Sequence, residues 1–398
     1  MKTVMILGGS ILQLPAIIKA RDMGYKVIVC DMNPNAVAFR EDGIVKEIIS
    51  TTDSSRLLEC AKKYQIDAVL TICTDQPMNS VAKIANELHL RGLSERTAFL
   101  ATNKFAMRKC LCEHGVPCPA FAAVSSINEY LKAIKSFPAK FIVKPVDSSG
   151  SRGVRLVNDS RDEGDVIEAF VYCKKSSHSG QILLEEYMEG PEVSVETLTV
   201  GGVCHVIQIT DKLTTGAPHF VEIGHSQPSR LNFSVQERIK QVAIAANKAI
   251  GIRSGPSHTE IIVTKEGPKV VELGARLGGD CITTHLVPLS TGVDMVSAVI
   301  NDAMGLPVDY KHRFEKGSCI RFFDKSVVGR IKRIEGFDEV REMDGVIDAA
   351  FMKKEGDFAV QLNGSGDRIA FVISQKETVD EAVKCCDEAI KKIVITTE

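Results

Sequence analysis

A chain of 398 residues is too long for one hydrophobic core, so two or three domains are expected. Hydrophobic residues make up 44% and charged residues 25% of the chain, which is typical of a globular protein in water. The formal net charge of −2 gives no general attraction to nucleic acid or membrane, since such binding normally needs a basic surface, and we expect neither as a partner.

Twelve cysteines are scattered along the chain without a C-x-x-C pair. We find no secretory leader, and the cysteines therefore indicate reduced thiols in a cytoplasmic protein. The apolar N-terminal run is interrupted by Gly8-Gly9-Ser10, Gln13 and Pro15, so a strand and a helix explain it better than a signal peptide. No apolar run approaches the length of a membrane span.

Residues 3–90 repeat a strand-then-helix pattern, which predicts a parallel sheet of the Rossmann-like kind with ligands at the carboxyl ends of its strands. Asp31 ends the second expected strand, where a dinucleotide dehydrogenase carries its ribose-binding acid. The glycine fingerprint fails, however, because Ser10 and Gln13 stand at its later glycine positions. Nicotinamide binding is therefore disfavoured, and this domain carries a small substrate or serves as a scaffold. We expect strands at residues 3–7, 26–30 and 68–73 and a helix at 12–23.

Residues 94–114 have a helical pattern that Gly115-Val116-Pro117 ends. Lys104 and Arg108 lie one turn apart on one face of this helix. Both are either solvated helix charges, which is the common situation, or ligands of an anion.

A strand at residues 139–143 leads through Lys144 into the Gly/Ser-rich segment 147–154. Backbone N–H groups of such a hairpin tip can close over phosphate oxygens, although the segment is not a Walker loop. Lys144 ends a buried strand and needs a partner, which an anion would supply.

The next strand, at residues 181–188, ends in Glu185 and Glu186 and is followed by a turn and a new strand that begins at Glu192. This connector can seat a planar base with its backbone groups, and Glu192 is a natural acceptor for ribose hydroxyls. The alternative is an ordinary acidic strand end.

Residues 203–233 form an irregular polar stretch that we interpret as a long loop. Its His225 has no obvious nucleophile partner nearby in sequence, which favours a loop histidine over a catalytic one. A helix follows at residues 234–250.

Two alternating segments, residues 258–263 and 269–273, flank a Lys-Glu-Gly-Pro turn and predict a β-hairpin. Side chains alternate along a strand, so Glu272 should share a face with Val270, and Glu260 and Glu272 should meet across the ladder. Neighbouring carboxylates repel unless a cation lies between them, and Mg²⁺ takes few carboxylates together with phosphate oxygens. The pattern predicts a metal–nucleotide site, with surface glutamates as the alternative.

After the hairpin we expect a helix at residues 293–304. The C-terminal ninety or so residues that follow read as a small α+β unit, with strands near 319–323, 358–362 and 368–374 and a closing helix at 378–392.

Five segments follow one another along the chain in the order TNKFAMR, FIVKPVDSSGSRGV, LLEEYMEGPEVSVE, HTEIIV and VVELGARLGGD. They resemble the signature elements of the ATP-grasp superfamily of carboxylate–amine ligases, and their order and spacing match over nearly the whole chain. Within this superfamily the resemblance is greatest to the amino-acid (dipeptide) ligases, with purine-biosynthetic ligases and biotin carboxylase more distant.

The resemblance implies a role for individual residues. Glu260 and Glu272 match the magnesium ligands, Arg276 the cation that steadies the acyl phosphate, and Lys212 a further lysine for the terminal phosphate. Asp75, His225, Gly278 and Gly279 are candidates to line the substrate pocket. For ATP, the resemblance implies phosphate-binding Lys104 and Lys144, a lid with Ser148, Ser149, Gly150, Ser151 and Gly153, an adenine hinge with Glu185, Glu186, Tyr187 and Met188, and ribose-binding Glu192.

One position departs from the family pattern, because Gly274 stands where many members carry an asparagine metal ligand. One or two Mg²⁺ (or Mn²⁺) would then be held by Glu260 and Glu272 with phosphate oxygens and water. The implied fold is a Rossmann-like domain at 1–93, an ATP-grasp domain at 94–305 with its lid at about 116–186, and a small α+β domain at 306–398.

The implied activity is ATP-dependent amide-bond formation between a small carboxylate, such as an amino acid, and an amine, with release of ADP and phosphate. A homodimer is the implied assembly. The alternatives are a ligase or carboxylase that uses bicarbonate or formate, and a nucleotide-binding regulatory protein without turnover.

Overall fold

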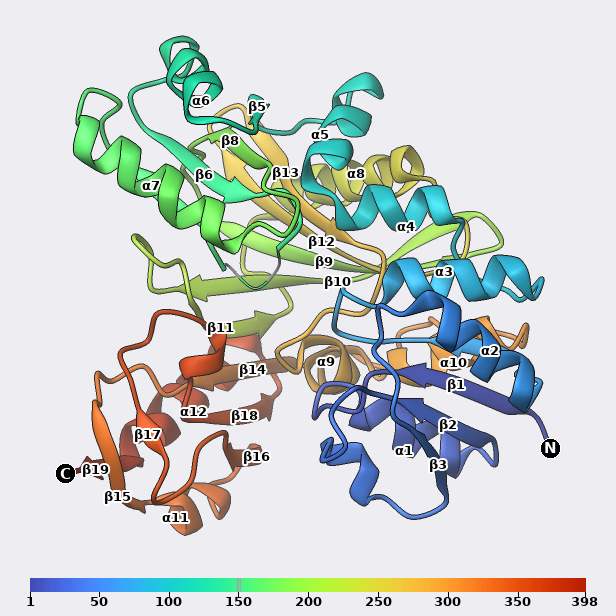
Figure 1. Ribbon diagram of the computed structural model, residues 1–398. Helices are drawn as coiled ribbons and strands as arrows, with labels where there is room; N and C mark the ends of the chain where they lie inside the picture. Colours follow the sequence, from blue (N-terminus) through green and yellow to red (C-terminus); the bar gives the residue numbers. More distant parts are fainter. Residues whose placement is uncertain (149, 151) are drawn as a thin grey trace.

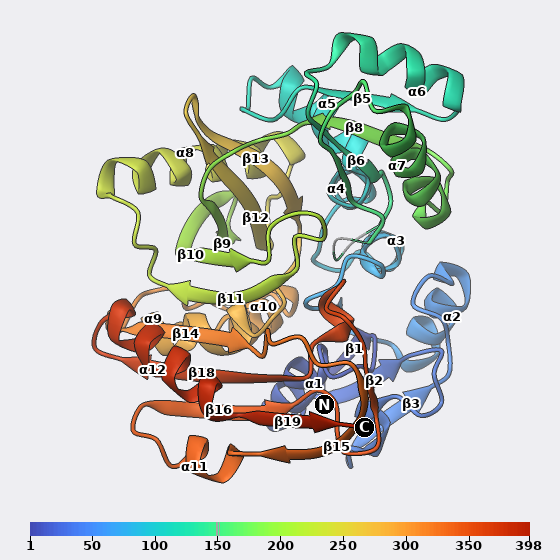
Figure 2. The same ribbon diagram turned by 90° about the vertical axis from the view of Figure 1, so that its left-hand side faces the viewer.

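The computed structural model describes residues 1–148, 150 and 152–398. A long central sheet carries a lid above one end, and the N-terminal and C-terminal parts lie side by side below it (Figures 1 and 2). This arrangement is mixed α/β and α+β, as expected. Among the described residues, no helix is both long and apolar enough to cross a membrane.

The N-terminal part is a parallel sheet of order β3-β2-β1-β4 with apolar layers on both faces. Along β1, Val4 and Ile6 pack into one buried cluster, whereas Met5 and Leu7 pack into another on the opposite face. The expected strands at residues 3–7 and 26–30 are confirmed, the one expected at 68–73 ends at Leu70, and a strand at Ile44–Glu47 was missed. The elements are β1 (Thr3–Leu7), α1 (Leu14–Asp22), β2 (Lys26–Cys30), β3 (Ile44–Glu47), α2 (Ser54–Tyr64), β4 (Ala68–Leu70) and α3 (Met78–Glu87).

The helical segment expected at residues 94–114 consists of two helices, α4 (Glu95–Thr102) and α5 (Lys104–Glu113). They are separated at Asn103, whose backbone is extended and whose side chain accepts a hydrogen bond from the Ala106 N–H at 2.9 Å. Asparagine is a favoured N-cap for this reason, and the break places Lys104 in the first turn of α5.

The lid is an antiparallel sheet of order β5-β8-β6-β7. Tyr130, Phe141 and Phe170 form aromatic contacts in its core. Its elements are β5 (Phe121–Val124), α6 (Ile127–Ala133), β6 (Phe141–Pro145), β7 (Arg155–Val157), α7 (Glu163–Ser176) and β8 (Ile182–Glu186).

The central sheet has eight strands in the order β13-β12-β9-β10-β11-β14-β18-β16. Helix α8 packs on the first four of these strands. The first five strands and the helices that accompany them are β9 (Glu192–Val200), β10 (Val203–Thr214), β11 (Glu222–Gln227), α8 (Phe233–Ile250), β12 (Gly255–Thr264), β13 (Gly267–Gly274), α9 (Val287–Thr291) and α10 (Met295–Ala303).

Much of the long loop expected at residues 203–233 is in fact strand, because β10 and β11 belong to this sheet. Several of the polar side chains that suggested a loop are buried and hydrogen-bonded. Gln227, for example, is 0% exposed, and its Nε2 donates to Oγ1 of Thr210 at 2.8 Å. Polarity misled the prediction because hydrogen-bonded polar groups can lie inside a sheet.

Three strands of the C-terminal part, β14, β18 and β16, continue the central sheet, and β17, β15 and β19 form a separate three-stranded sheet. The closing helix packs on β14 and β18, and β15, α11, β16 and β19 were missed. The elements are β14 (Gly317–Phe322), β15 (Gly329–Glu335), α11 (Phe337–Arg341), β16 (Val346–Phe351), β17 (Phe358–Ala359), β18 (Ala370–Lys376), α12 (Val379–Lys392) and β19 (Val394–Thr397).

Candidate active site

Lys104 and Arg108 both point into the protein from α5. They are 7% and 0% exposed, so the alternative of two solvated helix charges is wrong. Nζ of Lys104 donates to Oε1 of Glu272 at 2.7 Å and to the Ser148 carbonyl oxygen at 2.8 Å. Lys104 therefore joins the start of the Gly/Ser segment to a carboxylate of the hairpin.

Arg108, Lys144 and Glu185 form a buried ion triad. Nε of Arg108 lies 2.6 Å from Oε1 of Glu185, and Nζ of Lys144 lies 2.6 Å from Oε2. Burial alone would raise the pKa of Glu185, but the two cations outweigh it and hold the pKa below its usual range. Burial lowers the pKa of Lys144. Lys144 thus has the partner that its position demanded, and here that partner is a carboxylate.

The Gly/Ser segment includes two predicted residues, Ser149 and Ser151, that lie outside the described residues. Gly153 has φ +77°, and a Cβ atom there would lie 2.5 Å from Cβ of Ser176 and 2.8 Å from Cγ of Pro145. A glycine is therefore required at this turn. Gly150 also has a positive φ, of +65°.

The connector after β8 places its acidic residues in different surroundings. Glu186 pairs with Lys269 at 3.1 Å and accepts from the Ala120 N–H at 3.1 Å, so it ties the lid to β13. Nζ of Lys140 lies 3.9 Å from the ring centre of Tyr187, and Met188 is 9% exposed. The adenine and ribose roles of this connector stay predictions.

Glu260 and Glu272 are opposite each other in the antiparallel pair β12–β13, as predicted. A register shift between Glu260 and Ile261 makes this pairing possible, because Ile261 already faces Val270 and Val271 is left as the extra residue. Val270 packs in the core with Ile261. The prediction that Glu272 shares a face with Val270 is therefore wrong, because the bulge turns Glu272 to the opposite face.

Lys212, on β10, lies at the centre of three carboxylates. Its Nζ atom is 2.6 Å from Glu192, 3.3 Å from Glu260 and 3.6 Å from Glu222. Burial opposes the charged form of Lys212, but the three acids outweigh it and raise its pKa. The same lysine helps to hold the pKa of Glu260 well below its usual value, against the effect of burial. Lys212 thus connects the candidate ribose acid with a candidate metal ligand.

Arg276 forms a bidentate ion pair with Asp75 from the N-terminal part, with both N–O distances at 2.9 Å. A Cβ atom at Gly274 would lie 2.9 Å from Cζ of Arg276 and 3.0 Å from Oδ1 of Asp75. The departure from the family pattern at Gly274 therefore has a physical reason, because the space for a side chain is taken by this pair. The structure brings together two residues that the sequence treated separately.

Gly278 lies against the hairpin and leaves no room for a side chain. A Cβ atom there would be 2.7 Å from Nδ1 of His258 and 2.9 Å from Oε2 of Glu196. His258 lies 2.8 Å from Glu196 and 3.4 Å from Glu260. Burial lowers the pKa of His258, but the two carboxylates outweigh it and raise the pKa to about 9. The neighbouring Gly279 is half-buried.

His225 lies on β11 and is 1% exposed. Its Nε2 is 3.3 Å from Oδ2 of Asp280, which Arg368 also binds. Sequence reasoning missed Arg368. Asp280 lies within residues 276–284 and Glu222 in the segment around His225, which the sequence offered as candidates to line the substrate pocket, although neither residue was given a role.

The cluster fits the groups that the family uses. Glu260 and Glu272 are 25% and 28% exposed, and each is held by a lysine, at 3.3 and 2.7 Å. Two carboxylates match the preference of Mg²⁺ for few protein ligands together with phosphate oxygens and water. The described residues contain no group of three or more His, Cys, Asp and Glu arranged for a metal, so phosphate and water would have to complete the coordination.

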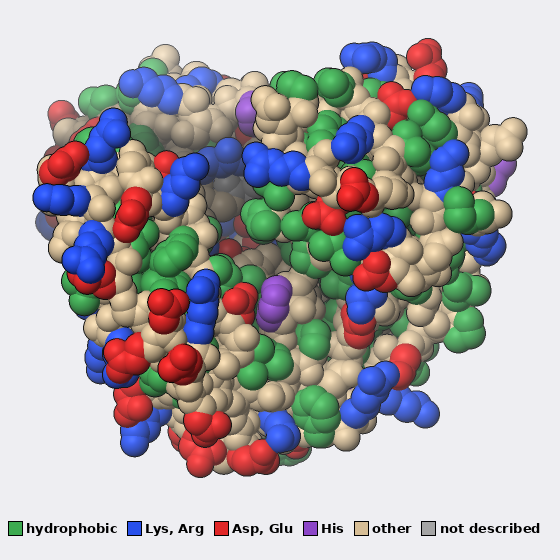
Figure 3. All heavy atoms as spheres, turned by 90° about the horizontal axis from the view of Figure 1, so that it is seen from below, with side chains coloured by type: hydrophobic (Ala, Val, Ile, Leu, Met, Phe, Trp, Pro, Cys, Tyr) green, Lys and Arg blue, Asp and Glu red, His purple; other side chains and the backbone are tan. Residues whose placement is uncertain are grey.

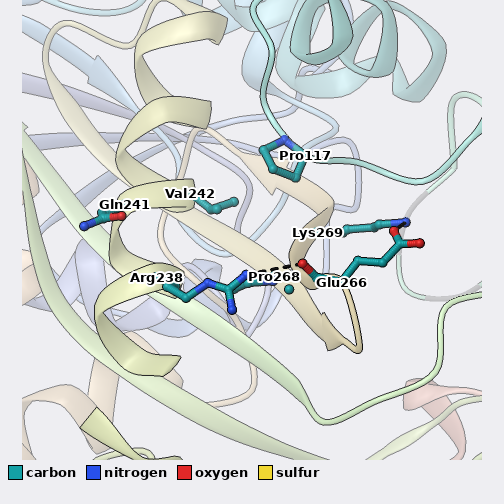
Figure 4. A pocket seen from close by; sticks show the side chains of 8 residues that line it. Pro117, Arg238, Gln241, Val242, Glu266, Pro268 and Lys269 are labelled. Atoms are coloured by element: carbon teal, nitrogen blue, oxygen red, sulfur yellow. Dashed lines mark hydrogen bonds and ion pairs between the residues drawn. The ribbon is translucent and has the colours of Figure 1, made fainter. Parts of the chain in front are cut away.

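The surface of the molecule has a hollowed face and a separate pocket (Figures 3 and 4). The face formed by the N-terminal and C-terminal parts is hollowed, with Lys and Arg side chains along the rim (Figure 3). A separate surface pocket of about 310 Å³ lies between α8 and the turn of the β12–β13 hairpin (Figure 4). Arg238 and Lys269 line that pocket, and none of the predicted site residues does.

Comparison with known proteins agrees with the fold. The model of the ATP-grasp domain matches residues 137–284, and that of L-amino acid ligase C-terminal domain 2 matches residues 321–398. The chain is similar to the solved L-amino acid ligase from Bacillus licheniformis, with a TM-score of 0.86 and 22% identity over 100% of this chain and 99% of that one.

Two curated relatives are also ligases. Phosphoribosylamine–glycine ligase of Caldanaerobacter subterraneus subsp. tengcongensis is 24% identical over 87% of this chain and 86% of its own length. Alanine–anticapsin ligase of Bacillus subtilis (strain 168) is 25% identical over 62% of this chain and 56% of its own length. The chain is therefore a member of the ATP-grasp superfamily of carboxylate–amine ligases, with an ATP-grasp domain followed by an L-amino acid ligase C-terminal domain.

Proposed function

We propose that this ATP-dependent ligase joins an amino acid, or a similar small carboxylate, to an amine through an acyl phosphate. The observation that carries the proposal is the ion-paired cluster in which Lys104 binds Glu272, Lys212 binds Glu260 and Arg276 binds Asp75. The match of residues 321–398 to the L-amino acid ligase C-terminal domain supports the amino-acid substrate.

The chemistry requires activation of a carboxylate, because its own leaving group would be oxide. A carboxylate oxygen attacks the γ-phosphorus of ATP, the bond from that phosphorus to the β–γ bridging oxygen breaks, and ADP leaves. The amine then attacks the acyl carbon, the carbon–oxygen bond breaks, and phosphate leaves with one oxygen of the original acid. The amine loses a proton as the amide forms.

Within this scheme, Lys104 and Lys144 hold the phosphates and Lys212 approaches the terminal one. Each of these lysines is paired with a carboxylate in this structure. On binding, the phosphates of ATP would take the place of these carboxylates as the anionic partners of the lysines. Glu260 and Glu272 would hold the magnesium ion, which offsets charge on the phosphoryl group when bound. Arg276 steadies the charge on the acyl phosphate.

The acidic side of the cluster suits an amine substrate. Glu222 and Asp280 are 18% and 29% exposed, and they share one arginine, Arg368. Their surplus negative charge can hold an ammonium group before the proton is lost. The N-terminal part contributes Asp75, which pairs with Arg276.

The test is product analysis across a matrix of amino acids and amines. We expect ADP and phosphate to form only when both substrates are present, and an ¹⁸O-labelled carboxylate to pass one label to phosphate. AMP and pyrophosphate as products would overturn the acyl-phosphate route.

The similarity to phosphoribosylamine–glycine ligase favours a second candidate, a purine-type ligase. Turnover with glycine and a phosphoribosylamine, and not with other amines, would establish it. Dependence of ATP turnover on bicarbonate or formate would instead support the remaining alternative.

The location and assembly of the protein stay predictions. All twelve cysteines are free thiols, which agrees with the reducing cytoplasm that we expect. The expected homodimer can be checked by light scattering.

A further inference from the structure

Arg368 comes from the C-terminal part and reaches the candidate substrate pocket. It precedes β18, within the region matched by the L-amino acid ligase C-terminal domain. Its side chain is only 1% exposed. A buried guanidinium is unfavourable unless its donors find acceptors, so its partners reveal what it is built to hold.

The partners of Arg368 are two acids on different elements. Nη1 and Nη2 donate to the two carboxylate oxygens of Asp280 at 2.8 and 2.9 Å. Nε donates to the carbonyl oxygen of Glu222 at 3.0 Å, and Nη2 approaches its Oε2 at 3.3 Å. This fork geometry is specific to arginine, because a lysine offers a single point charge.

The ring of Phe322, on β14, packs against the guanidinium group of Arg368. Cζ of Arg368 lies 3.9 Å from the centre of the Phe322 ring. The edge of the same ring packs at 87° to the ring of His225, with 6.4 Å between centroids. The guanidinium of Arg368 and the imidazole of His225 both contact the Asp280 carboxylate, and Phe322 packs against both of these groups.

The backbone around Asp280 needs such support. Asp280 and Cys281 have φ values of +52° and +62°, in the left-handed region that residues other than glycine seldom adopt. A backbone of this kind persists where surrounding contacts hold it. The strained pair follows directly on the segment that carries Arg276, Gly278 and Gly279.

Glu222 connects Arg368 to the nucleotide side of the cluster. One of its oxygens lies 3.3 Å from Arg368, and the other lies 3.6 Å from Lys212. Lys212 in turn contacts Glu260 at 3.3 Å. Arg368 itself touches neither Lys212 nor Glu260 and acts through Glu222.

We propose that Arg368 is a positioning residue through which the C-terminal domain shapes the substrate pocket: its fork fixes Asp280 and Glu222 as the acidic wall that receives the amine. The proposal rests on the proposed function. It assigns a specificity role to a domain that contributes none of the residues predicted from sequence for the site.

The test compares Arg368→Met with a matched control, Arg321→Met. Arg321 is also a buried arginine of the C-terminal part, but its ion partner is Asp387 on α12, at 2.8 Å. We expect Arg368→Met to raise KM for the amine about tenfold or more, with the affinity for Mg·ATP changed less than about threefold. Arg368→Lys should fall between Arg368→Met and the wild type because it keeps the charge and loses the fork.

Arg321→Met should leave both KM values near those of the wild type. Equal effects of the two variants, or a loss of Mg·ATP affinity in Arg368→Met, would overturn the proposal. The melting temperatures of both variants show whether a raised KM reflects a destabilised fold or only the loss of the acidic wall formed by Asp280 and Glu222.

A second measurement does not depend on turnover. In ¹⁵N-histidine-labelled protein, the His225 ring signals, assigned with His225→Gln, report the contact with Asp280. They should shift in Arg368→Met and stay in place in Arg321→Met, and unchanged signals would overturn the positioning role. A wild-type protein that ligates no acid to any amine would refute the proposed function instead, whatever the His225 signals show.

Discussion

Asp75 and Arg276 meet face to face across the boundary between the N-terminal sheet and the central sheet, with two parallel contacts of 2.9 Å. Both side chains are nearly buried, at 15% and 14% exposure. Burial opposes the charge of Arg276, but Asp75 outweighs it and raises the pKa of the guanidinium. Likewise Arg276 overcomes the effect of burial on Asp75 and lowers the pKa of that carboxyl group. The ion pair with Asp75 therefore fixes the position of the Arg276 guanidinium.

Replacement of Arg276 should slow ligation without weakening nucleotide binding. In Arg276→Ala we expect kcat for amide formation to fall about 10²-fold, because the lost interaction acts on charge that develops during reaction. Calorimetry with Mg·ATP should give an affinity close to that of the wild type. The exposed Arg333→Ala is the control, and a defect confined to ATP binding would contradict the role given to Arg276.

Glu272 should be essential for turnover if it is a metal ligand. We expect Glu272→Gln to lower turnover at least about 10²-fold, and to weaken Mg²⁺-dependent nucleotide binding measured by calorimetry, with the fold unchanged by circular dichroism. Glu266→Gln is a matched control, because Glu266 lies in the turn of the same hairpin with its side chain 77% exposed. Near-normal activity of Glu272→Gln would remove the metal site from the hairpin.

The sequence predicted the elements that local pattern controls. Apolar runs predicted β1 and β2, and two alternating segments about a turn predicted the β12–β13 hairpin. The turn alone would pair Glu260 with Val271, so the predicted opposition of Glu260 and Glu272 depends on the bulge. The bulge at Val271 could not be foreseen, because it depends on a tertiary contact. Arg108, 0% exposed, donates to the Val271 carbonyl oxygen from another element.

Long-range partners were equally hidden. Asp75 and Arg276 are 201 residues apart in sequence, and Arg368 and Glu222 are 146 apart. Such pairs are set by the packing of whole domains, which periodicity does not report. The polar strands β10 and β11 were missed for a related reason, since side chains such as Gln227 are satisfied by partners on a neighbouring strand and on α9.

A side chain at Gly274 should displace the Asp75–Arg276 pair. The new Cβ of Gly274→Ala would lie 2.9 Å from Cζ of Arg276, closer than real Cβ contacts, and 3.0 Å from Oδ1 of Asp75, which is tighter than most, so the pair would have to shift. We expect a loss of ligation rate similar in direction to that of Arg276→Ala and a lower melting temperature. Gly366→Ala is the control, because its Cβ would meet no atom within 4 Å. A Gly274→Ala protein with full activity would show that Arg276 need not stay in this position.

His258 should make the metal-free protein lose stability as the pH rises. Its folded pKa of about 9 lies above the usual 6.5, because Glu196 and Glu260 outweigh the effect of burial. Because the folded pKa is raised, protonation of His258 contributes its full stabilisation below about pH 6.5, and this contribution is lost as the pH rises through about 9. The shift corresponds to on the order of 3 kcal/mol of unfolding free energy. Urea unfolding in EDTA between about pH 6 and 10 should therefore show a decline in the wild type that is smaller in His258→Gln. Parallel curves would mean that His258 is not the imidazolium held between these two carboxylates.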